Sequence, residues 1–137
     1  MVMALAFHAA SGLVESVAFD PESFTCTALS LIDSDTGVLM VADDDGDLCG
    51  VIGGIVYPHY FNVKHLTGQE MFWWVNPDSR SASTGKHLLN ALHNWAESKG
   101  VETFMMVSLE QLNPVGVGKL YMRHGYTPVE HSYMRTF

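Results

Sequence analysis

The sequence WWVNPDSRSASTGKHLL, residues 73–89, leads from an apolar strand through a loop of small residues into an amphipathic helix. At such a junction the first backbone N–H groups and the positive end of the helix dipole point at one spot, which suits an anion. Small side chains let a phosphate approach the loop, and two of the chain's seven basic residues, Arg80 and Lys86, flank it. An ordinary strand-to-helix connection with a polar cap has the same pattern, so the spacing alone leaves both interpretations open.

The residues around this stretch predict helices and strands that alternate along the chain. A short helix is expected over residues 8–19, and a second from Asp20 and Pro21 to about Ile32, because a cap-type Asp precedes Pro at the first helical position. Further elements are expected as strands over 38–42, 48–57, 69–75 and 101–109, helices over 86–99 and 114–124, a loop over 58–67, and two short strands within 126–137. Glycines at 50, 53 and 54 suggest a bulge or a close backbone approach in the second strand. The alternation predicts an α/β (α+β) fold in which helices cover a sheet.

Two motifs carry a resemblance to a known family. The loop over residues 80–85, RSASTG, lacks the G-x-x-x-x-G-K-[ST] pattern of a Walker loop and the G-x-G-x-x-G pattern of a dinucleotide site. It resembles the pyrophosphate loop of the GNAT superfamily of N-acetyltransferases, [RQ]-x-x-G-x-[GA], with Ser83 in place of the first glycine. Downstream, residues 113–126 resemble the second signature of that family, through Asn113, Gly116, Leu120, Tyr121, Gly125 and Tyr126.

The resemblance implies a fold, a cofactor and a set of site residues. The fold would be a GNAT-like mixed, mostly antiparallel central sheet, splayed in the middle and flanked by helices on both faces, with acetyl-CoA in the split. The backbone near Val75 would pair with the pantetheine arm, and Asn113 would contact the cofactor from the other side. The hydroxyl of Tyr121 matches the group that protonates the departing thiolate in many members, although a buried aromatic bonded to backbone is the alternative. The pyrophosphate would be held by the loop residues Arg80, Ser81, Ala82, Ser83, Thr84, Gly85 and Lys86.

A base that removes the proton of the attacking amine is the least determined part of the site. Glu70 lies in an apolar strand, where loss of hydration would raise its pKa toward a useful value. Strand alternation could instead direct Gln69 inward. Glu110, at the end of the following strand, and a chain of water molecules are the other candidates.

Composition bounds the remaining interpretations. The chain has 137 residues, 47% hydrophobic and 16% charged, with a mean hydropathy of +0.11, so residues 1–137 are expected to form one folded domain. A net charge of −8 disfavours nucleic acid and favours a cationic substrate or partner. The family resemblance implies that the acceptor is a small-molecule or peptide amine. Neither a membrane span nor a metal site is expected, because no long apolar run and no H-x-x-x-H spacing occurs. A cytoplasmic location is the expectation, and the oligomeric state is open, with a homodimer allowed.

The sequence thus favours an N-acetyltransferase that moves an acetyl group from acetyl-CoA to a primary amine by direct attack, resembling small phage-type members of the family. Two alternatives remain. One is a non-catalytic acyl-CoA-binding protein that kept the fold, because Ser83 replaces a glycine and the base is undetermined. The other is an acidic interaction protein, such as a phage-encoded decoy that mimics nucleic acid. Release of free thiol from acetyl-CoA in the presence of amines distinguishes the enzyme from both.

Overall fold

A computed structural model describes residues 1–80 and 83–137. Its elements follow the chain as α1 (Val2–Ala10), α2 (Pro21–Asp33), β1 (Gly37–Asp44), β2 (Asp47–His59), β3 (Asn62–Val75), the 3-10 turn η1 (Pro77–Ser79), α3 (Thr84–Ser98), β4 (Thr103–Met105) and α4 (Pro114–Arg123). The four strands form one sheet in the order β1-β2-β3-β4, antiparallel except for the parallel pair β3–β4. The predicted mixed, mostly antiparallel sheet is therefore confirmed.

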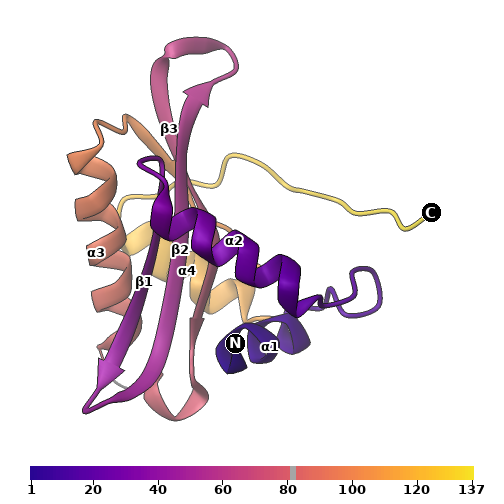
Figure 1. Ribbon diagram of the computed structural model, residues 1–137. Coiled ribbons are helices and arrows are strands. Elements are labelled where there is room, and N and C mark those ends of the chain that lie inside the picture. Colours follow the sequence, from indigo (N-terminus) through magenta and orange to yellow (C-terminus); the bar gives the residue numbers. More distant parts are fainter. Residues whose placement is uncertain (81–82) are drawn as a thin grey trace.

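Helices cover both faces of this sheet (Figure 1). On one face, Leu31 of α2 packs with Val51, Phe72 and Trp74, and residues of α1 pack around them. On the other face, Leu88 and Leu92 of α3 pack against Ile52 and Val75. Neighbouring residues of β2 and β3 thus serve opposite cores, as the alternation of side chains along a strand requires. The two apolar layers hold the end of β3 between them and fix the direction of its side chains from Phe72 to Val75.

The second helix begins at its predicted residue because its N-terminal cap is formed as expected, and it ends one residue beyond the predicted limit. Asp20 adopts an extended conformation, and its carboxylate accepts the backbone N–H of Ser23 at 3.0 Å. The bulge predicted from the glycines is also present, as a shift of register between Gly53 and Gly54. At Gly53 an added Cβ would lie 2.8 Å from the ring of Phe72, so the close approach of that ring requires glycine.

Four predicted elements are wrong in extent or kind. The helix expected over 8–19 lies at α1 instead, and the chain turns at Gly12, whose φ of +79° ends helical geometry. The loop expected over 58–67 is mostly strand, because β2 and β3 continue as a hairpin almost to its tip. The strand expected over 101–109 is limited to β4. Residues 126–137 contain no strand and run away from the sheet in Figure 1.

Among the described residues, no helix is both long and apolar enough to cross a membrane. Residues 1–80 and 83–137 likewise contain no group of three or more His, Cys, Asp or Glu placed to hold a metal ion.

Candidate active site

The sheet splits between β3 and β4 directly after a short paired stretch. The two strands pair from Thr67 to Gln69 on one side and from Thr103 to Met105 on the other. At the next position of β3, the side chain of Glu70 takes over the role of a strand partner. Its Oε2 accepts the backbone N–H of Val107 at 3.0 Å. A carboxylate thus fills the point at which the two backbones part, between the third and fourth strands of the sheet.

Tyr121 of α4 also contacts the backbone of Val107, at its carbonyl group instead of its N–H group. Its hydroxyl donates to the carbonyl oxygen of Val107 at 2.8 Å, and its side chain is buried. The two predicted catalytic side chains, Glu70 and Tyr121, are therefore brought together on the two polar groups of one residue. In this conformation the tyrosine hydroxyl makes the backbone contact that was the alternative to a catalytic role.

The surroundings of these two groups raise their pKa values. Glu70 is 5% exposed, and burial raises the pKa of its carboxyl to about 7, although the hydrogen bond from Val107 acts in the opposite direction. Burial, and then the charge of Glu70, raise the pKa of Tyr121 well above its ordinary value. The same two causes raise the pKa of Tyr126 to about 12. Near neutral pH the carboxyl can therefore take up or release a proton, whereas both hydroxyls remain protonated.

A cavity of about 170 Å³ lies at the split and contains both groups. Its wall is mostly apolar and includes Phe7 from α1, Trp73 from β3 and Val117 from α4. Residues of α1, β3 and α4 therefore line one common cavity beside the split. An apolar wall around one carboxyl is the arrangement that keeps the pKa of that carboxyl raised.

The other candidate bases lie outside this cavity. Glu110 is exposed and does not line it. Gln69 does not face it either, because its side-chain oxygen accepts the hydroxyl of Tyr57 at 2.9 Å. Glu70 is thus the acidic residue that the fold places at the split.

The start of α3 has the features expected of an anion site. Ser83 precedes the helix, its side chain makes no capping hydrogen bond, and the first turn contains no acidic residue. Because the φ of Ser83 is −75°, serine is unstrained where the family motif has glycine. Lys86 is exposed in the first turn. The free N–H groups of this turn and the helix dipole remain available to a negatively charged ligand.

Gly85, in the same turn, lies against the strand. A Cβ at this position would lie 3.3 Å from Cζ2 of Trp73 and 3.7 Å from Cγ2 of Val75. The glycine therefore lets the start of α3 approach β3 closely. Of the other predicted loop residues, Thr84 begins the helix, and Ser81 and Ala82 lie outside the described residues.

Arg80 and Val75 are bonded to each other. The Nε of Arg80 donates to the carbonyl oxygen of Val75 at 2.9 Å, and its guanidinium carbon lies 4.5 Å from the ring centroid of Trp74. The strand end and the arginine are thereby fixed at the entrance to the loop. The remaining guanidinium N–H groups of Arg80 are the ones that could bind an anion.

Asn113 has a structural role at the start of α4. It adopts a left-handed conformation with a φ of 50°, and its Oδ1 accepts the backbone N–H of Gly116 at 3.2 Å. A Cβ at position 116 would collide with the side-chain amide of Asn113, so glycine makes room for this cap. A contact between the Asn113 amide and a cofactor remains a prediction.

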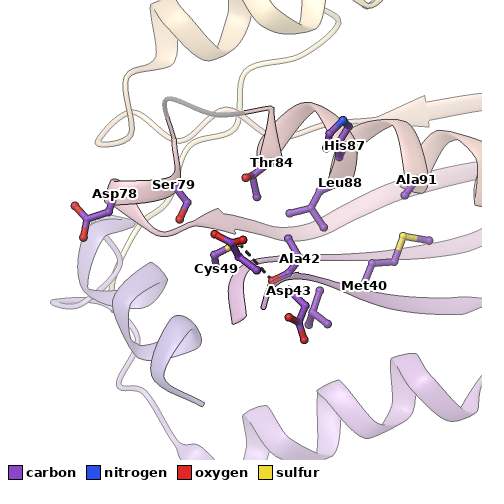
Figure 2. Close-up of a pocket in the computed structure, with 12 residues that line it drawn as sticks. Met40, Ala42, Asp43, Cys49, Asp78, Ser79, Thr84, His87, Leu88 and Ala91 are labelled. Carbon is purple, nitrogen blue, oxygen red and sulfur yellow. Dashed lines mark hydrogen bonds between the residues drawn. The ribbon is translucent and has the colours of Figure 1, made fainter. Parts of the chain in front are cut away.

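A larger, open groove of about 690 Å³ lies on the α3 face, away from the split (Figure 2). Met40 and Ala42 of β1 form one side, and Leu88 and Ala91 of α3 form the other. Asp43, Asp44 and Asp78 give its end a negative charge. The groove lacks both Glu70 and Tyr121, so the chemistry is better assigned to the smaller cavity.

Two groups at the split were missed by the sequence reasoning. The indole nitrogen of Trp73 is buried and has no hydrogen-bond partner among the described residues. The backbone of Val107 is the point that both candidate catalytic groups contact. A signal for Trp73 existed, because it stands on the predicted strand beside Val75, but nothing in its residue type predicts an unpaired donor. A backbone group such as that of Val107 leaves no signal in sequence.

A sheet of this topology, splayed beside a strand-to-helix loop and covered by helices on both faces, defines the GNAT class of acetyltransferase folds. Residues 7–126 match the sequence profile described as the Acetyltransferase (GNAT) family. The chain belongs to that family.

Solved structures agree with this assignment at the level of the fold. An aminoglycoside acetyltransferase, HMB0005, from an uncultured soil metagenomic sample has a TM-score of 0.74 at 13% identity, over 99% of this chain and 89% of that one. AAC(6')-Iy in complex with a bisubstrate analogue, CoA-S-monomethyl-acetylneamine, has a TM-score of 0.73 at 16% identity, over 88% of this chain and 82% of that one. A ribosomal-protein-alanine N-acetyltransferase from Brucella melitensis biovar Abortus 2308 has a TM-score of 0.71 at 20% identity, over 99% of this chain and 89% of that one. A search of curated protein sequences found no match.

Proposed function

We propose that the protein is an N-acetyltransferase that moves an acetyl group from acetyl-CoA to a primary amine by direct attack in a ternary complex. The observation that carries the proposal is the position of Glu70 and Tyr121 on the two polar groups of Val107, at the split of the sheet. An acid–base group with a pKa near neutrality and a hydroxyl donor thus border one apolar cavity.

The residues present fit acetyl-CoA. The uncapped first turn of α3, with Ser83, Thr84, Gly85 and Lys86, offers N–H groups and positive charge to a pyrophosphate. Arg80 would add guanidinium donors, and Ser81 and Ala82 belong to the same proposed loop. The buried Trp73 indole N–H, which has no acceptor among the described residues, and the close approach allowed by Gly85 also favour a ligand at this place. Val75 and Asn113 are proposed as further contacts, through the strand backbone and the side-chain amide.

The proposed mechanism assigns one task to each side chain. Acetyl-CoA, when bound, supplies an acetyl group activated as a thioester. Glu70, ionised above its pKa of about 7, accepts the proton that the attacking amine loses. Tyr121 would donate its hydroxyl proton to the departing sulfur, which requires the hydroxyl to leave the carbonyl of Val107. The proton that Glu70 took from the amine would then pass to the tyrosinate, directly or through solvent, so that both side chains end in their starting states. The apolar wall excludes water from the thioester and keeps the carboxyl near its raised pKa.

The acceptor is proposed to be a small-molecule or peptide amine. The net charge of −8 favours a cation, and two of the similar structures are described as an aminoglycoside and a ribosomal-protein-alanine acetyltransferase. A single domain over residues 1–137, a phage-type subtype, a cytoplasmic location and a homodimer remain predictions from the sequence alone.

Release of free thiol from acetyl-CoA, measured against a panel of amines, tests the activity. We expect release that depends on an amine and is lost in Glu70→Gln. Binding of acetyl-CoA without release for any amine would favour the non-catalytic acyl-CoA-binding protein, and absence of binding would contradict the cofactor assignment altogether.

A further inference from the structure

Trp73 carries a buried donor that the proposed mechanism does not use. Its indole Nε1 is shielded from solvent and has no acceptor among the residues that the structure describes. Leaving a buried donor unpaired costs free energy, so such groups in folded proteins call for an explanation. The neighbouring residue shows the ordinary situation, since the Trp74 indole donates to Oδ1 of Asn76 at 3.0 Å. The two adjacent tryptophans thus differ in whether a described residue provides an acceptor for the indole N–H.

The position of the Trp73 ring relates it to the cavity at the split. The ring lines this cavity together with Glu70 and Tyr121. Its centroid lies 6.2 Å from that of the Tyr121 ring, and the two planes are inclined by 27°. Cζ2 of the same ring lies next to Gly85 at the start of α3, 3.3 Å from the position of an added Cβ. The indole therefore lies between the proposed pyrophosphate loop and the proposed proton donor.

We infer that the Trp73 indole N–H binds an amide carbonyl of the pantetheine arm of acetyl-CoA. This inference rests on the proposed function and adds a binding residue to it. The arm is the part of the cofactor that joins the pyrophosphate to the thioester, and it carries two amides on an otherwise flexible chain. An indole N–H can donate but cannot accept, so it selects a carbonyl oxygen. The flat face of the ring gives the methylene groups of the arm an apolar surface.

The first experiment observes the donor directly, by NMR on the wild-type protein. The chain has three tryptophans, Trp73, Trp74 and Trp95, so its ¹⁵N–¹H spectrum has three indole signals, and the Trp73→Phe spectrum identifies one of them. On addition of CoA, the Trp73 signal should move downfield, as a newly hydrogen-bonded N–H does. Adenosine 3'-phosphate 5'-diphosphate, which contains the pyrophosphate but lacks the arm, should leave this signal in place.

The second experiment measures affinity, because a signal can also move for indirect reasons. Trp73→Phe should weaken CoA binding about three- to tenfold, the effect of one neutral hydrogen bond, and should leave the affinity for the nucleotide half unchanged. Trp95→Phe is the matched control, since Trp95 packs on the α3 core and does not line the cavity. It should change neither affinity.

The outcomes separate this inference from the proposed function. A Trp73 signal that stays in place while CoA binds would overturn the inference and leave the acetyltransferase proposal standing. A signal that moves equally with the nucleotide half would overturn the assignment to the arm. If neither CoA nor its nucleotide half binds the wild type, the proposed function fails, and the inference fails with it.

Discussion

At the scale of single residues, Glu70 both joins the two parts of the split sheet and provides its titratable group. Its pKa is about 4.5 in the unfolded chain and about 7 in the folded protein, so the folded state holds the proton more tightly between these values. The free energy of unfolding should therefore fall as the pH rises from about 4.5 to about 7, and then level off. The shift corresponds to about 3 kcal/mol over this window.

Glu70→Gln should remove this pH dependence, because the amide cannot ionise but its oxygen can still accept the N–H of Val107. Urea denaturation at several pH values from 4 to about 8 measures the effect. We expect the variant to gain stability relative to the wild type as the pH increases. Glu110→Gln, at an exposed position, is the control and should follow the wild type. Parallel curves for Glu70→Gln and the wild type would show that the carboxyl is not buried as described.

The same variant makes a prediction about activity. If Glu70 is the base, kcat/KM of the wild type should rise with pH through about 7 as the carboxyl ionises. In Glu70→Gln this rise should disappear, and kcat should fall by about 10²- to 10⁴-fold, the usual contribution of a general base. A variant that keeps wild-type kcat at each pH would assign proton removal to water.

Tyr121→Phe separates two roles of one hydroxyl. Loss of the 2.8 Å bond to the carbonyl of Val107 should lower the free energy of unfolding by about 1 kcal/mol, whether or not the hydroxyl is catalytic. A catalytic hydroxyl should in addition lower kcat, by about 10²-fold because a thiolate is already a tolerable leaving group. Melting temperature and kcat are measured on the same variant. A small loss of stability with wild-type turnover would leave Tyr121 with only its structural role.

At the scale of elements, the position of α3 against β3 depends on Gly85. A Val side chain there would press on Cζ2 of Trp73, which a Cβ alone would approach to 3.3 Å. Gly85→Val should therefore separate the start of α3 from the strand and weaken CoA binding about tenfold or more, as loss of charge-assisted hydrogen bonds does. Some stability should also be lost, contrary to what an exposed loop would predict. Titration calorimetry with CoA measures the binding.

Gly118→Ala is the control for that experiment, because a Cβ at this position of α4 has nothing within 4 Å. Alanine is favoured over glycine inside a helix by about 1 kcal/mol, so this variant should be at least as stable as the wild type. Its CoA affinity should be unchanged. Equal affinities for Gly85→Val and the wild type would contradict the role of the α3 start in binding.

The elements that sequence could predict are those whose signals are local. The cap at Asp20 and Pro21 and the apolar stripe of α3 fix those helices without reference to other parts of the chain. The strand expected after α3 is cut short at β4 because the side chain of Glu70 replaces the next backbone partner, which is a contact between distant residues. The two strands expected within 126–137 pair neither with each other nor with β4, the last strand of the sheet, and an unpaired strand is not stable in water.

The candidate site shows the same division. The loop from Arg80 and the tyrosine of α4 could be found by motif, because residue type and spacing define them. Whether Glu70 or Gln69 faces the cavity could not, because the bulge beside Gly54 shifts the register that an alternation argument depends on. The common attachment of Glu70 and Tyr121 to Val107 is a consequence of tertiary structure and could be found only there.

At the scale of the whole molecule, the split sheet predicts that acetyl-CoA stabilises the fold. Among the described residues, β3 pairs with β4 only over three positions, Thr67 to Gln69. Two side-chain hydrogen bonds, from Glu70 and Tyr121 to the backbone of Val107, add to this connection. A ligand that bridges the start of α3 and the α4 side of the cavity would bind the native state and not the unfolded chain. At about one hundred times its dissociation constant it should add about 2.7 kcal/mol to the free energy of unfolding.

In a thermal scan this gain should raise the melting temperature by an amount on the order of 10 °C for a domain of this size. Hydrogen exchange should show which elements are stabilised. Acetyl-CoA bound across the split should slow exchange of the backbone amides in α4 as well as in α3. The nucleotide half of CoA, which can bind the α3 loop but lacks the arm, should slow exchange in α3 alone and raise the melting temperature less. An unchanged melting temperature at millimolar acetyl-CoA would contradict the cofactor assignment. Equal protection of α4 by both ligands would show that the arm does not lie in the split.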